Sequence, residues 1–571
     1  MRLDLFTVDD TVLLVGEGNF SFCVDLVSTK KFVNITASCL DTEVKTKKAE
    51  ENVLYLKQKG VRVLFGVDAT KLTEHPVLKN ESFSKIVFNF PHVGGKMKIN
   101  LNRELLRQFA LSACHLLDTN GQLLISLCKG QGGTSAEKQI RRWDDTWKVV
   151  EMVADGNLVL TAVEPFDGDS YPNYKSAGYR GTDKSFHTDG ALVHIFCKRQ
   201  PLFPSVEVSV LQESLEQCSI KIPSGEILCP KYYFQKYIQT PVNNVALFFQ
   251  NSLKTFIEHS EKSVRSVQES EVPLFDPRCF SDSSADKVLI CPLRHSLLDI
   301  TSVPLHLWWM CHENYLLYSG MVFHDLGSDF SQAPVSNQIM LFGYNSYDIL
   351  RAYLDNLLLN NIGDHFYLKA SSIVNSSPVL QYKSMDCPTF IENTNFEVKL
   401  ANILLLSKDC EIMRDSTNTV LQHFTVDGSI KNEEIHTEFC LMYPDTLSEI
   451  LFHTSWRHLY ASETCLKVGY KNIHVKFSSL YGLKYSFDIC FSQSPLYSHK
   501  KFYSILWQLV GDIVTDVQLL NTYESPKGWT SHCFRIEYQS FDKALSRKKA
   551  IDIHQNVVGK MLSHCLQVTI H

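Results

Sequence analysis

The sequence predicts three regions: an α/β domain with a doubly wound, Rossmann-like sheet, an α+β middle region, and a ferredoxin-like α+β domain. Near the N-terminus, short apolar runs alternate with helix-length segments, which is typical of parallel β-α-β units. In the last hundred residues the expected elements follow the order β-α-β-β-α-β. The region between them is acidic, unlike either end. We therefore expect domains over residues 1–200, 201–477 and 478–571.

The first predicted strand, residues 12–15, ends in two glycines. The loop reads Gly16-Glu17-Gly18-Asn19-Phe20-Ser21, and a helical pattern follows it. Glycines at this place let backbone N–H groups approach a bound ligand, because no Cβ stands in the way. The loop lacks the third glycine of the dinucleotide fingerprint and the Gly-Lys-Ser/Thr of a phosphate loop. Taken alone, it fits either a nucleotide-like cofactor or a simple tight turn.

Polar residues follow the next two strands as well. Strands are predicted over residues 33–40 and 61–67, with a helix over 43–59 between them. Asp41 ends the first of these strands, where an acidic side chain suits a ribose diol. Asp68 ends the other, where a carboxylate can accept a hydrogen bond from an adenine amino group. The candidate cofactor residues are therefore Gly16, Glu17, Gly18, Asn19, Phe20, Ser21, Asp41, Thr42, Asp68 and Ala69.

A fourth strand, residues 85–90, leads into the turn Asn89-Phe90-Pro91-His92. We expect a helix over 102–117, a strand over 122–128, a helix over 136–154 and strands over 158–163 and 191–197 to complete the sheet. Trp143 and Trp147 lie four residues apart on that second helix, as core residues or as a platform for a base. Residues 131–135 form a glycine-rich loop beside the proposed site, either a lid or a simple connection.

Two of these motifs together resemble the family of large-subunit ribosomal RNA uridine-N3 methyltransferases. They are the stretches 16–22 and 89–95, and the resemblance covers residues 8–200, including Tyr171-Pro172-Asn173-Tyr174. It implies a Rossmann-like fold, S-adenosylmethionine as cofactor, and RNA contacts by Tyr171 and Tyr174. In the family a basic His/Arg cluster usually follows the last motif. Here residues 175–182 differ from it, so the substrate side departs from the family pattern.

The turn at the fourth strand suits transfer of a methyl group to a base. Such a transfer is an in-line displacement, so the protein mainly fixes the position of the acceptor. The turn resembles that of base amino-methyltransferases, in which Asn holds the target nitrogen, and this makes Asn89, Pro91 and His92 the catalytic candidates. His92 is either a general base for a uridine N3 proton or a histidine that supports the turn from behind. The target base would have to leave its stack.

The C-terminal region resembles the ferredoxin-fold anticodon-binding domain of phenylalanyl-tRNA synthetases. Strands are expected over residues 484–491, 514–523, 532–538 and 566–570, with helices over 500–513 and 547–564. Two departures are Gly482, where the family has Pro, and His571, where the family ends in Arg. The resemblance implies RNA binding, and the candidates for backbone contact are Lys500, Lys501 and Arg535.

Charge and composition narrow the classes of protein. Residues 1–200 hold 26 Lys/Arg against 24 Asp/Glu, residues 478–571 hold 10 against 7, and residues 201–477 hold 20 against 31. RNA contact is therefore expected at the two ends, and a protein partner at the acidic middle. That middle has strand-like runs at 287–291, 305–311, 315–321 and 338–342, and lacks the class II synthetase signature of a glycine-rich helix start with Arg. It reads as a degenerate synthetase-like region.

Cysteine usage and targeting signals suggest a compartment. The 17 cysteines are scattered without a Cys-x-x-Cys pair, so we expect reduced thiols and no metal site. The N-terminus lacks the pattern of a signal or transit peptide, and no apolar run has the length of a membrane span. We expect a cytoplasmic protein, with the nucleus or nucleolus as alternatives.

These observations together predict an S-adenosylmethionine-dependent RNA methyltransferase that acts at uridine N3 of a structured RNA, either rRNA or tRNA. The fused C-terminal domain favours tRNA or another small structured RNA. The alternative is a non-catalytic scaffold that binds tRNA or other RNA and is related to phenylalanyl-tRNA synthetase. Intact glycines and Asp68 argue against a decayed site.

Overall fold

The structure is a computed structural model of the 571-residue chain. It describes residues 5–30, 34–94, 98–137, 141–176, 188–199, 219–222, 225–228, 245–266, 313–323, 330, 335–361, 411–417, 421–430, 433–444, 465–469, 472–476, 480, 482–526, 528–540 and 543–571. The chain divides into two compact units. The first comprises residues 1–205, 477–487 and 537–557, and the second comprises 206–476, 488–536 and 558–571.

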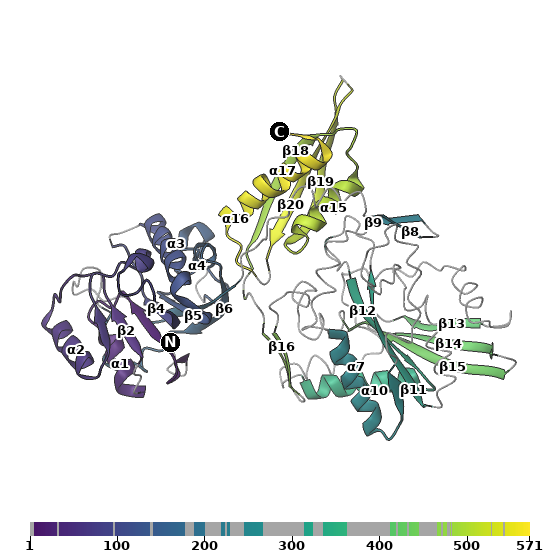
Figure 1. The fold of residues 1–571 in the computed structure, drawn as a ribbon, viewed down its shortest axis with the longest axis horizontal. Coiled ribbons are helices and arrows are strands. Elements are labelled where there is room, and N and C mark those ends of the chain that lie inside the picture. The colour runs from purple at the N-terminus through teal and green to yellow at the C-terminus, as the bar shows by residue number, and fades with distance from the viewer. Residues whose placement is uncertain are drawn as a thin grey trace. The chain divides into compact units, whose positions relative to one another are not determined.

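A seven-stranded mixed sheet forms the N-terminal region, as predicted for a Rossmann-like fold (Figure 1). The strand order is β3-β2-β1-β4-β5-β7-β6. The first five strands in this order are parallel, and β7 runs antiparallel to both β5 and β6. The strands are β1 (Val12–Val15), β2 (Ile35–Ser38), β3 (Arg62–Leu64), β4 (Phe83–Asn89), β5 (Leu117–Leu127), β6 (Leu158–Pro165) and β7 (Leu192–Lys198).

Helices cover both faces of this sheet, because its central strands are apolar on both sides. Helices α1 (Ser21–Lys30) and α2 (Lys47–Gln58) lie on one face, and α3 (Ile99–Leu116) and α4 (Val149–Ala154) lie on the other (Figure 1). Two separate apolar cores result, one around Phe22 and Leu56 and the other around Phe109 and Leu123. Helix α2 begins where Thr46 accepts a hydrogen bond from the N–H of Ala49.

The helix predicted over residues 136–154 is wrong. The structure has a 3-10 turn, η3 (Trp143–Asp145), and then the short helix α4. Lys148 separates them with a left-handed backbone, at φ 50°. A left-handed residue cannot continue a right-handed helix, so Trp143 and Trp147 do not lie on one helical face.

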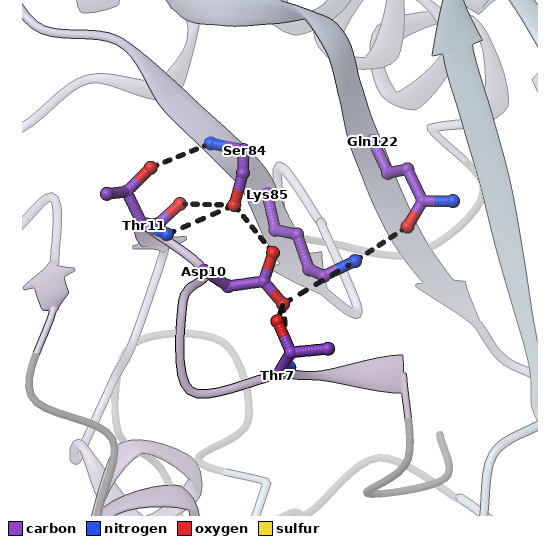
Figure 2. Close-up of polar contacts among 6 residues, drawn as sticks. All are labelled: Thr7, Asp10, Thr11, Ser84, Lys85 and Gln122. Atoms are coloured by element: carbon purple, nitrogen blue, oxygen red, sulfur yellow. Dashed lines mark hydrogen bonds and ion pairs between the residues drawn. The ribbon is translucent and has the colours of Figure 1, made fainter.

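A polar cluster sits at the amino ends of β1, β4 and β5 (Figure 2). The ammonium of Lys85, which is 9% exposed, donates to Gln122 Oε1 at 2.7 Å and lies 3.8 Å from an Asp10 carboxylate oxygen. The hydroxyl of Ser84 donates to the other Asp10 oxygen at 2.7 Å. Because the carboxyl ends of the strands lie at the opposite edge, we assign this cluster to holding the strands in register.

The middle region contains an antiparallel sheet with helices, consistent with an α+β arrangement. Six strands follow the order β10-β11-β12-β15-β14-β13, and only β10 pairs in parallel. Two of the four predicted strands coincide with β11 and β12, and the runs at 287–291 and 305–311 lie outside the described residues. The elements are β8 (Ser219–Ile222), β9 (Gly225–Leu228), α7 (Val245–His259), β10 (Val264–Ser266), β11 (Tyr315–Phe323), β12 (Val335–Phe342), α10 (Ser346–Asn361), β13 (Glu411–Thr417), β14 (Leu421–Ile430), β15 (Glu433–Met442), β16 (Cys465–Gly469) and β17 (Asn472–Lys476).

The last region has the element order β-α-β-β-α-β that its sequence predicts, with sheet order β19-β20-β18-β21. The terminal helical stretch runs through a π-helical segment, residues Ile553–Gly559. The predicted last strand is shorter than expected, because Leu566 still belongs to the preceding helix. The elements are β18 (Lys484–Ser492), α15 (His499–Val510), β19 (Val514–Glu524), β20 (Thr530–Gln539), α16 (Arg547–Asp552), α17 (Lys560–Leu566) and β21 (Thr569–Ile570).

One cysteine pair corrects the expectation of reduced thiols. Cys490 on β18 and Cys533 on β20 form a disulfide across 43 residues of sequence, with a Cα–Cα distance of 4.1 Å. The sequence spacing does not reveal the pair, because only strand pairing brings the two residues together. Cys23, Cys39 and Cys128 are free thiols, and burial raises the pKa of Cys128 to about 11.

Within the described ranges, no helix is both long and apolar enough to cross a membrane. The same part of the chain holds no group of three or more His, Cys, Asp or Glu side chains arranged to bind a metal ion.

Candidate active site

The polar residues at the carboxyl ends of the parallel strands lie along one edge of the N-terminal sheet. Strands β2 and β3 lie on one side of β1, and β4 and β5 lie on the other. The direction of the strand order therefore reverses at β1, and α/β sheets bind ligands at such a switch point. Backbone hydrogen bonds join the neighbouring ends: Glu17 N to Ser38 O at 2.9 Å, Cys39 N to Leu64 O at 3.1 Å, Gly66 N to Asp41 O at 2.8 Å, and Phe90 N to Ser126 O at 2.9 Å. The loops after five strands therefore form one continuous edge.

The first loop requires glycine at Gly16. Its φ is +73°, and a Cβ at this position would lie 2.4 Å from Cε2 of Phe88. The side chain of Glu17 turns inward, where its carboxylate accepts the N–H of Cys23 at 3.3 Å. Burial raises the pKa of Glu17 to about 7. Of the proposed cofactor residues, Glu17 and the fully buried Phe20 thus have only their backbone at this edge.

Polar contacts hold helix α1 against the motif Tyr171-Pro172-Asn173-Tyr174, which we call the third motif. Oδ1 of Asn19 accepts the N–H of Ser21, the first residue of α1, at 3.1 Å, and the amide of Asn19 donates to the carbonyl of Lys175 at 3.1 Å. The carboxylate of Asp25, 1% exposed, accepts the backbone N–H of Asn173 at 3.0 Å and its side-chain amide at 2.7 Å. These contacts hold the third motif against the loop after β1.

The two tyrosines of that motif occupy different environments. Tyr171 is 2% exposed, and its ring lies 4.7 Å from that of Phe22. The ring is therefore part of the core. Tyr171 has no exposed surface with which to make the expected RNA contact. Tyr174 is partly buried and stacks on Phe90 with ring centroids 6.5 Å apart. It links the third motif to the turn after β4.

The two acidic cofactor candidates carry other contacts. Asp41 pairs with Lys45, and both side chains are exposed. Asp68 begins the 3-10 helix η2 (Ala69–Glu74), where its Oδ1 accepts the N–H of Thr70 at 2.8 Å and its hydroxyl at 2.7 Å. Both bonds use Oδ1, so Oδ2 of Asp68 accepts no hydrogen bond from the described residues.

The turn after β4 is strained and anchored. Phe90 has φ 52°, which is uncommon for a residue other than glycine. The hydroxyl of Ser126 on β5 donates to Oδ1 of Asn89 at 2.7 Å. This leaves Nδ2 of Asn89 buried, with no hydrogen-bond partner in the described part of the chain. A buried amide donor that the fold does not satisfy is unusual and points to a bound acceptor.

His92 is held by its own turn. The N–H of Gly94 donates to its Nδ1 at 2.7 Å. Since Nδ1 accepts, the proton of the neutral ring is on Nε2. Burial lowers the pKa of His92, which favours the neutral ring. In this arrangement Nε2 is a donor, so the expected general-base role would need the other tautomer.

A glycine-rich loop after β5 lies beside this turn. The buried carboxylate of Glu137 accepts the N–H groups of Gly130 and Gly132 at 2.7 and 3.0 Å. The loop carbonyl of Gln131 accepts the N–H of Trp147 at 2.7 Å. The ring of Trp147, 5% exposed, lies 5.9 Å from that of His92. Glu137 thus holds the start of this loop in place. From the sequence, the loop could have been either a lid or a simple connection.

The C-terminal candidates for RNA contact lie on the second compact unit. Lys500 and Lys501 are in the first turn of α15, which Ser498 caps by accepting the N–H of Lys501 at 3.2 Å. Arg535 on β20 makes a bidentate pair with Asp488, at 2.7 and 2.8 Å. That pair raises the pKa of Arg535, and an RNA phosphate would compete with Asp488 for this guanidinium.

Sequence reasoning missed three residues that complete the site. They are Ser126, Glu137 and Asp25, each a polar side chain buried beside a predicted motif. Ser126 interrupts the apolar run of residues 123–127, and this signal was visible in the sequence. Glu137 and Asp25 had no local signal, because the groups they hold come from loops elsewhere in the chain.

Comparison with known proteins first identifies relatives of the N-terminal region. A family model described as rRNA (uridine-N3-)-methyltransferase BTM5-like matches residues 13–178. The chain is also 26% identical to the 25S rRNA (uridine(2634)-N(3))-methyltransferase of Saccharomyces cerevisiae, over 30% of this chain and 58% of that protein. This match confirms the resemblance of the N-terminal region.

A second relative extends along almost the whole chain. Ferredoxin-fold anticodon-binding domain-containing protein 1 of Homo sapiens is 28% identical over 97% of this chain and 98% of its own length. The mitochondrial phenylalanine–tRNA ligase of Rattus norvegicus is 39% identical over 11% of this chain and 14% of that protein. The resemblance to an anticodon-binding domain is therefore confirmed as well.

Proposed function

We propose that this protein is an S-adenosylmethionine-dependent RNA methyltransferase that acts at N3 of a uridine. The observation that carries the proposal is a pair of hydrogen-bond donors at the turn after β4. Nδ2 of Asn89 is buried and unsatisfied by the described residues, and Nε2 of His92 carries the ring proton because Nδ1 accepts from Gly94. In uracil, N3 lies between two carbonyl oxygens, O2 and O4, and both are acceptors.

The two donors suit the chemistry of a uracil. N3 must pass its proton to solvent water as it gains the methyl group, and the charge of the deprotonated ring lies on O2 and O4. Donors from Asn89 and His92 would stabilise this charge. An exocyclic amino group, as in adenine or cytosine, would instead need acceptors there. Ser126 and Gly94 donate to the acceptor atoms of Asn89 and His92, so each of these two side chains has a donor group to offer the base.

The cofactor side of the site fits S-adenosylmethionine. The free Oδ2 of Asp68 suits an adenine amino group, Asp41 suits a ribose diol, and the exposed Gly18 offers backbone for close approach. When bound, the cofactor supplies a methyl group on a positively charged sulfur. Gly16, Glu17 and Phe20 bring only backbone to this loop. Gly16 has no side chain, and the side chains of Glu17 and Phe20 are buried.

The proposal is tested with purified protein, labelled S-adenosylmethionine and total RNA. We expect label in RNA, and 3-methyluridine after digestion to nucleosides. Asn89→Ala should abolish transfer of label and keep cofactor binding. Asp68→Asn should weaken cofactor binding. Calorimetry measures cofactor binding by both variants. Absence of cofactor binding by the wild-type protein would refute the enzyme and favour the non-catalytic scaffold. Label in a different nucleoside would refute uridine N3 as the acceptor but not the methyltransferase activity.

The relatives support RNA recognition by the C-terminal region, and we propose Lys500, Lys501 and Arg535 as its phosphate contacts. Lys500→Gln/Lys501→Gln should weaken RNA binding and reduce its salt dependence, with cofactor binding unchanged. Lys47→Gln/Lys48→Gln on α2 removes the same charge and serves as the control. Equal affinities for the two double variants would count against the C-terminal candidates.

A further inference from the structure

The side chains of Lys129, Arg141, Arg142, Trp143 and Lys148 form a basic aromatic surface beside the turn of His92. We call it the Trp143 surface. It comes from the loop after β5 and from the segment that precedes α4. We infer that it binds the RNA strand next to the target nucleotide, with Trp143 stacking on a base and the arginines contacting phosphates. This inference rests on the proposed function and names where its substrate binds.

Trp143 is exposed although its backbone is fixed. Its side chain is 39% exposed, while the backbone around it is tightly bonded. The guanidinium of Arg103 donates to the carbonyls of Asp144 at 2.7 Å and Thr146 at 2.6 Å. Thr146 N in turn donates to the carbonyl of Trp143 at 3.2 Å. A large aromatic ring presented on rigid backbone loses little entropy when a base stacks on it.

The surface adjoins the candidate active site through Trp147. The turn that begins at Trp143 ends at Trp147, whose ring lies 5.9 Å from that of His92 and whose N–H donates to the loop carbonyl of Gln131. Val149 N also donates to the carbonyl of Gly132, at 3.1 Å. A strand of RNA that delivers a base to His92 would therefore pass close to Trp143.

The charges around Trp143 favour a polyanion. Arg141 lies over Gly130, where an added Cβ would be 2.6 Å from its Nε, and donates to the carbonyl of Lys129 at 3.5 Å. Arg142 is exposed, and its side chain makes no ion pair or hydrogen bond with the described residues. The ammonium of Lys148 lies 5.4 Å from the Trp143 ring centroid.

Within residues 141–148, two exposed carboxylates lie among these positive charges. Asp144 is paired with Lys148 at 2.8 Å, and Asp145 is the other. An exposed aromatic ring beside basic side chains is typical of surfaces that hold single-stranded nucleic acid. The four basic side chains of this surface outnumber these two carboxylates, and a phosphate backbone matches that excess of positive charge, so we commit to RNA.

The test measures binding of the full chain to a fluorescent RNA stem-loop that has uridines in its loop. Trp143→Ala should weaken binding about 5- to 100-fold, and Trp143→Phe should restore most of it, because phenylalanine still stacks. Arg141→Gln/Arg142→Gln should weaken binding and lower the slope of log affinity against log salt by about 0.7 for each lost phosphate contact. Lys47→Gln/Lys48→Gln and Leu54→Ala, at exposed positions on α2, are the matched controls.

Two results would overturn the inference. One is RNA binding by Trp143→Ala and Arg141→Gln/Arg142→Gln that equals binding by the α2 controls. The other is loss of binding to a protein partner by these variants, with RNA binding intact. Calorimetry with S-adenosylmethionine separates this inference from the proposed function. If the wild-type protein binds no cofactor, the enzyme proposal fails, while the RNA affinities still decide the role of the Trp143 surface.

Discussion

Gly94 donates its backbone N–H to Nδ1 of His92 at 2.7 Å, and this bond determines what the ring can do. With Nδ1 engaged as an acceptor, the neutral ring has its proton on Nε2 and offers a donor. Protonation of the ring would place a second proton on Nδ1 and break the bond with Gly94. Burial, which lowers the pKa of His92, opposes that protonation.

We therefore expect methyl transfer to show no inflection from His92 between pH 6.5 and 8. Because the pKa is lowered, any loss of rate from its protonation should begin below pH 6.5. His92→Phe should lower kcat about 100-fold, the usual effect of removing one such donor, and His92→Gln should lose less, since its amide can donate. Initial rates of label transfer check this.

His75→Phe provides a matched control for His92. The Nδ1 of His75 accepts the N–H of Val77, two residues later, at 3.3 Å, in the same pattern as His92 and Gly94. Its substitution should leave the rate unchanged. A wild-type rate that falls with an inflection above pH 6.5, together with an inactive His92→Gln, would instead support the general-base role.

Glu17 should make the stability of the N-terminal domain depend on pH. Its pKa is raised by burial from 4.5 to about 7, so the folded state binds more protons than the unfolded state between these values. Stability must then fall as pH rises from about 4.5 to about 7 and level off above it, by at most about 3 kcal/mol. Glu17→Gln should remove this part of the pH dependence.

Urea midpoints at pH 5 and pH 8 measure the effect. The exposed Glu51 on α2 gives the control variant Glu51→Gln, which should keep the wild-type dependence. If Glu17→Gln and the wild-type protein lost the same stability between the two pH values, the burial of this carboxyl would not be the cause.

Gly16 should be needed for folding, apart from any role with a cofactor. Gly16→Ala combines a positive φ with a Cβ 2.4 Å from the ring of Phe88. Gly60 also has positive φ, +80°, but no atom within 4 Å of an added Cβ. Gly60→Ala should thus cost about 1 kcal/mol for its backbone, and Gly16→Ala about 1–3 kcal/mol more for the clash.

Unfolding free energies of the two alanine variants give this difference. Phe88→Leu added to Gly16→Ala should recover part of it, since neighbouring sites are not additive. Equal losses at Gly16 and Gly60 would show that the ring of Phe88 gives way freely.

Asp25 should hold the third motif in place. Its buried carboxylate accepts two hydrogen bonds from Asn173, at 3.0 and 2.7 Å. Asp25→Ala removes both of these hydrogen bonds to a charged group and should cost about 1–3 kcal/mol. Faster hydrogen exchange of the amides over residues 171–176 would detect the loosening, and the exposed Asp9 supplies the control Asp9→Ala. Unchanged exchange in Asp25→Ala would mean that the contacts of Lys175 suffice.

Elements with a local signal were predicted well. The apolar runs that became β1 and β4 and the helix that became α2 carry their own periodicity and end signals, such as the Thr46 cap. The helix predicted over 136–154 failed, since contacts of Arg103 with residues 144 and 146 and the left-handed Lys148 outweigh its local pattern. Nothing in the sequence shows that Cys490 meets Cys533, or that Tyr171 turns into the core.

The sequence by itself determined which residues stand at the carboxyl ends of the strands, because strand order and turn chemistry are local properties. Only the tertiary structure decided what those residues offer. Asn89 presents a donor because Ser126, 37 residues away on the neighbouring strand, occupies its acceptor oxygen. Glu17 offers only its backbone because the core takes its side chain. Hydrogen-bond direction and burial depend on neighbours that are distant in the chain, and a pattern of residue types does not contain them.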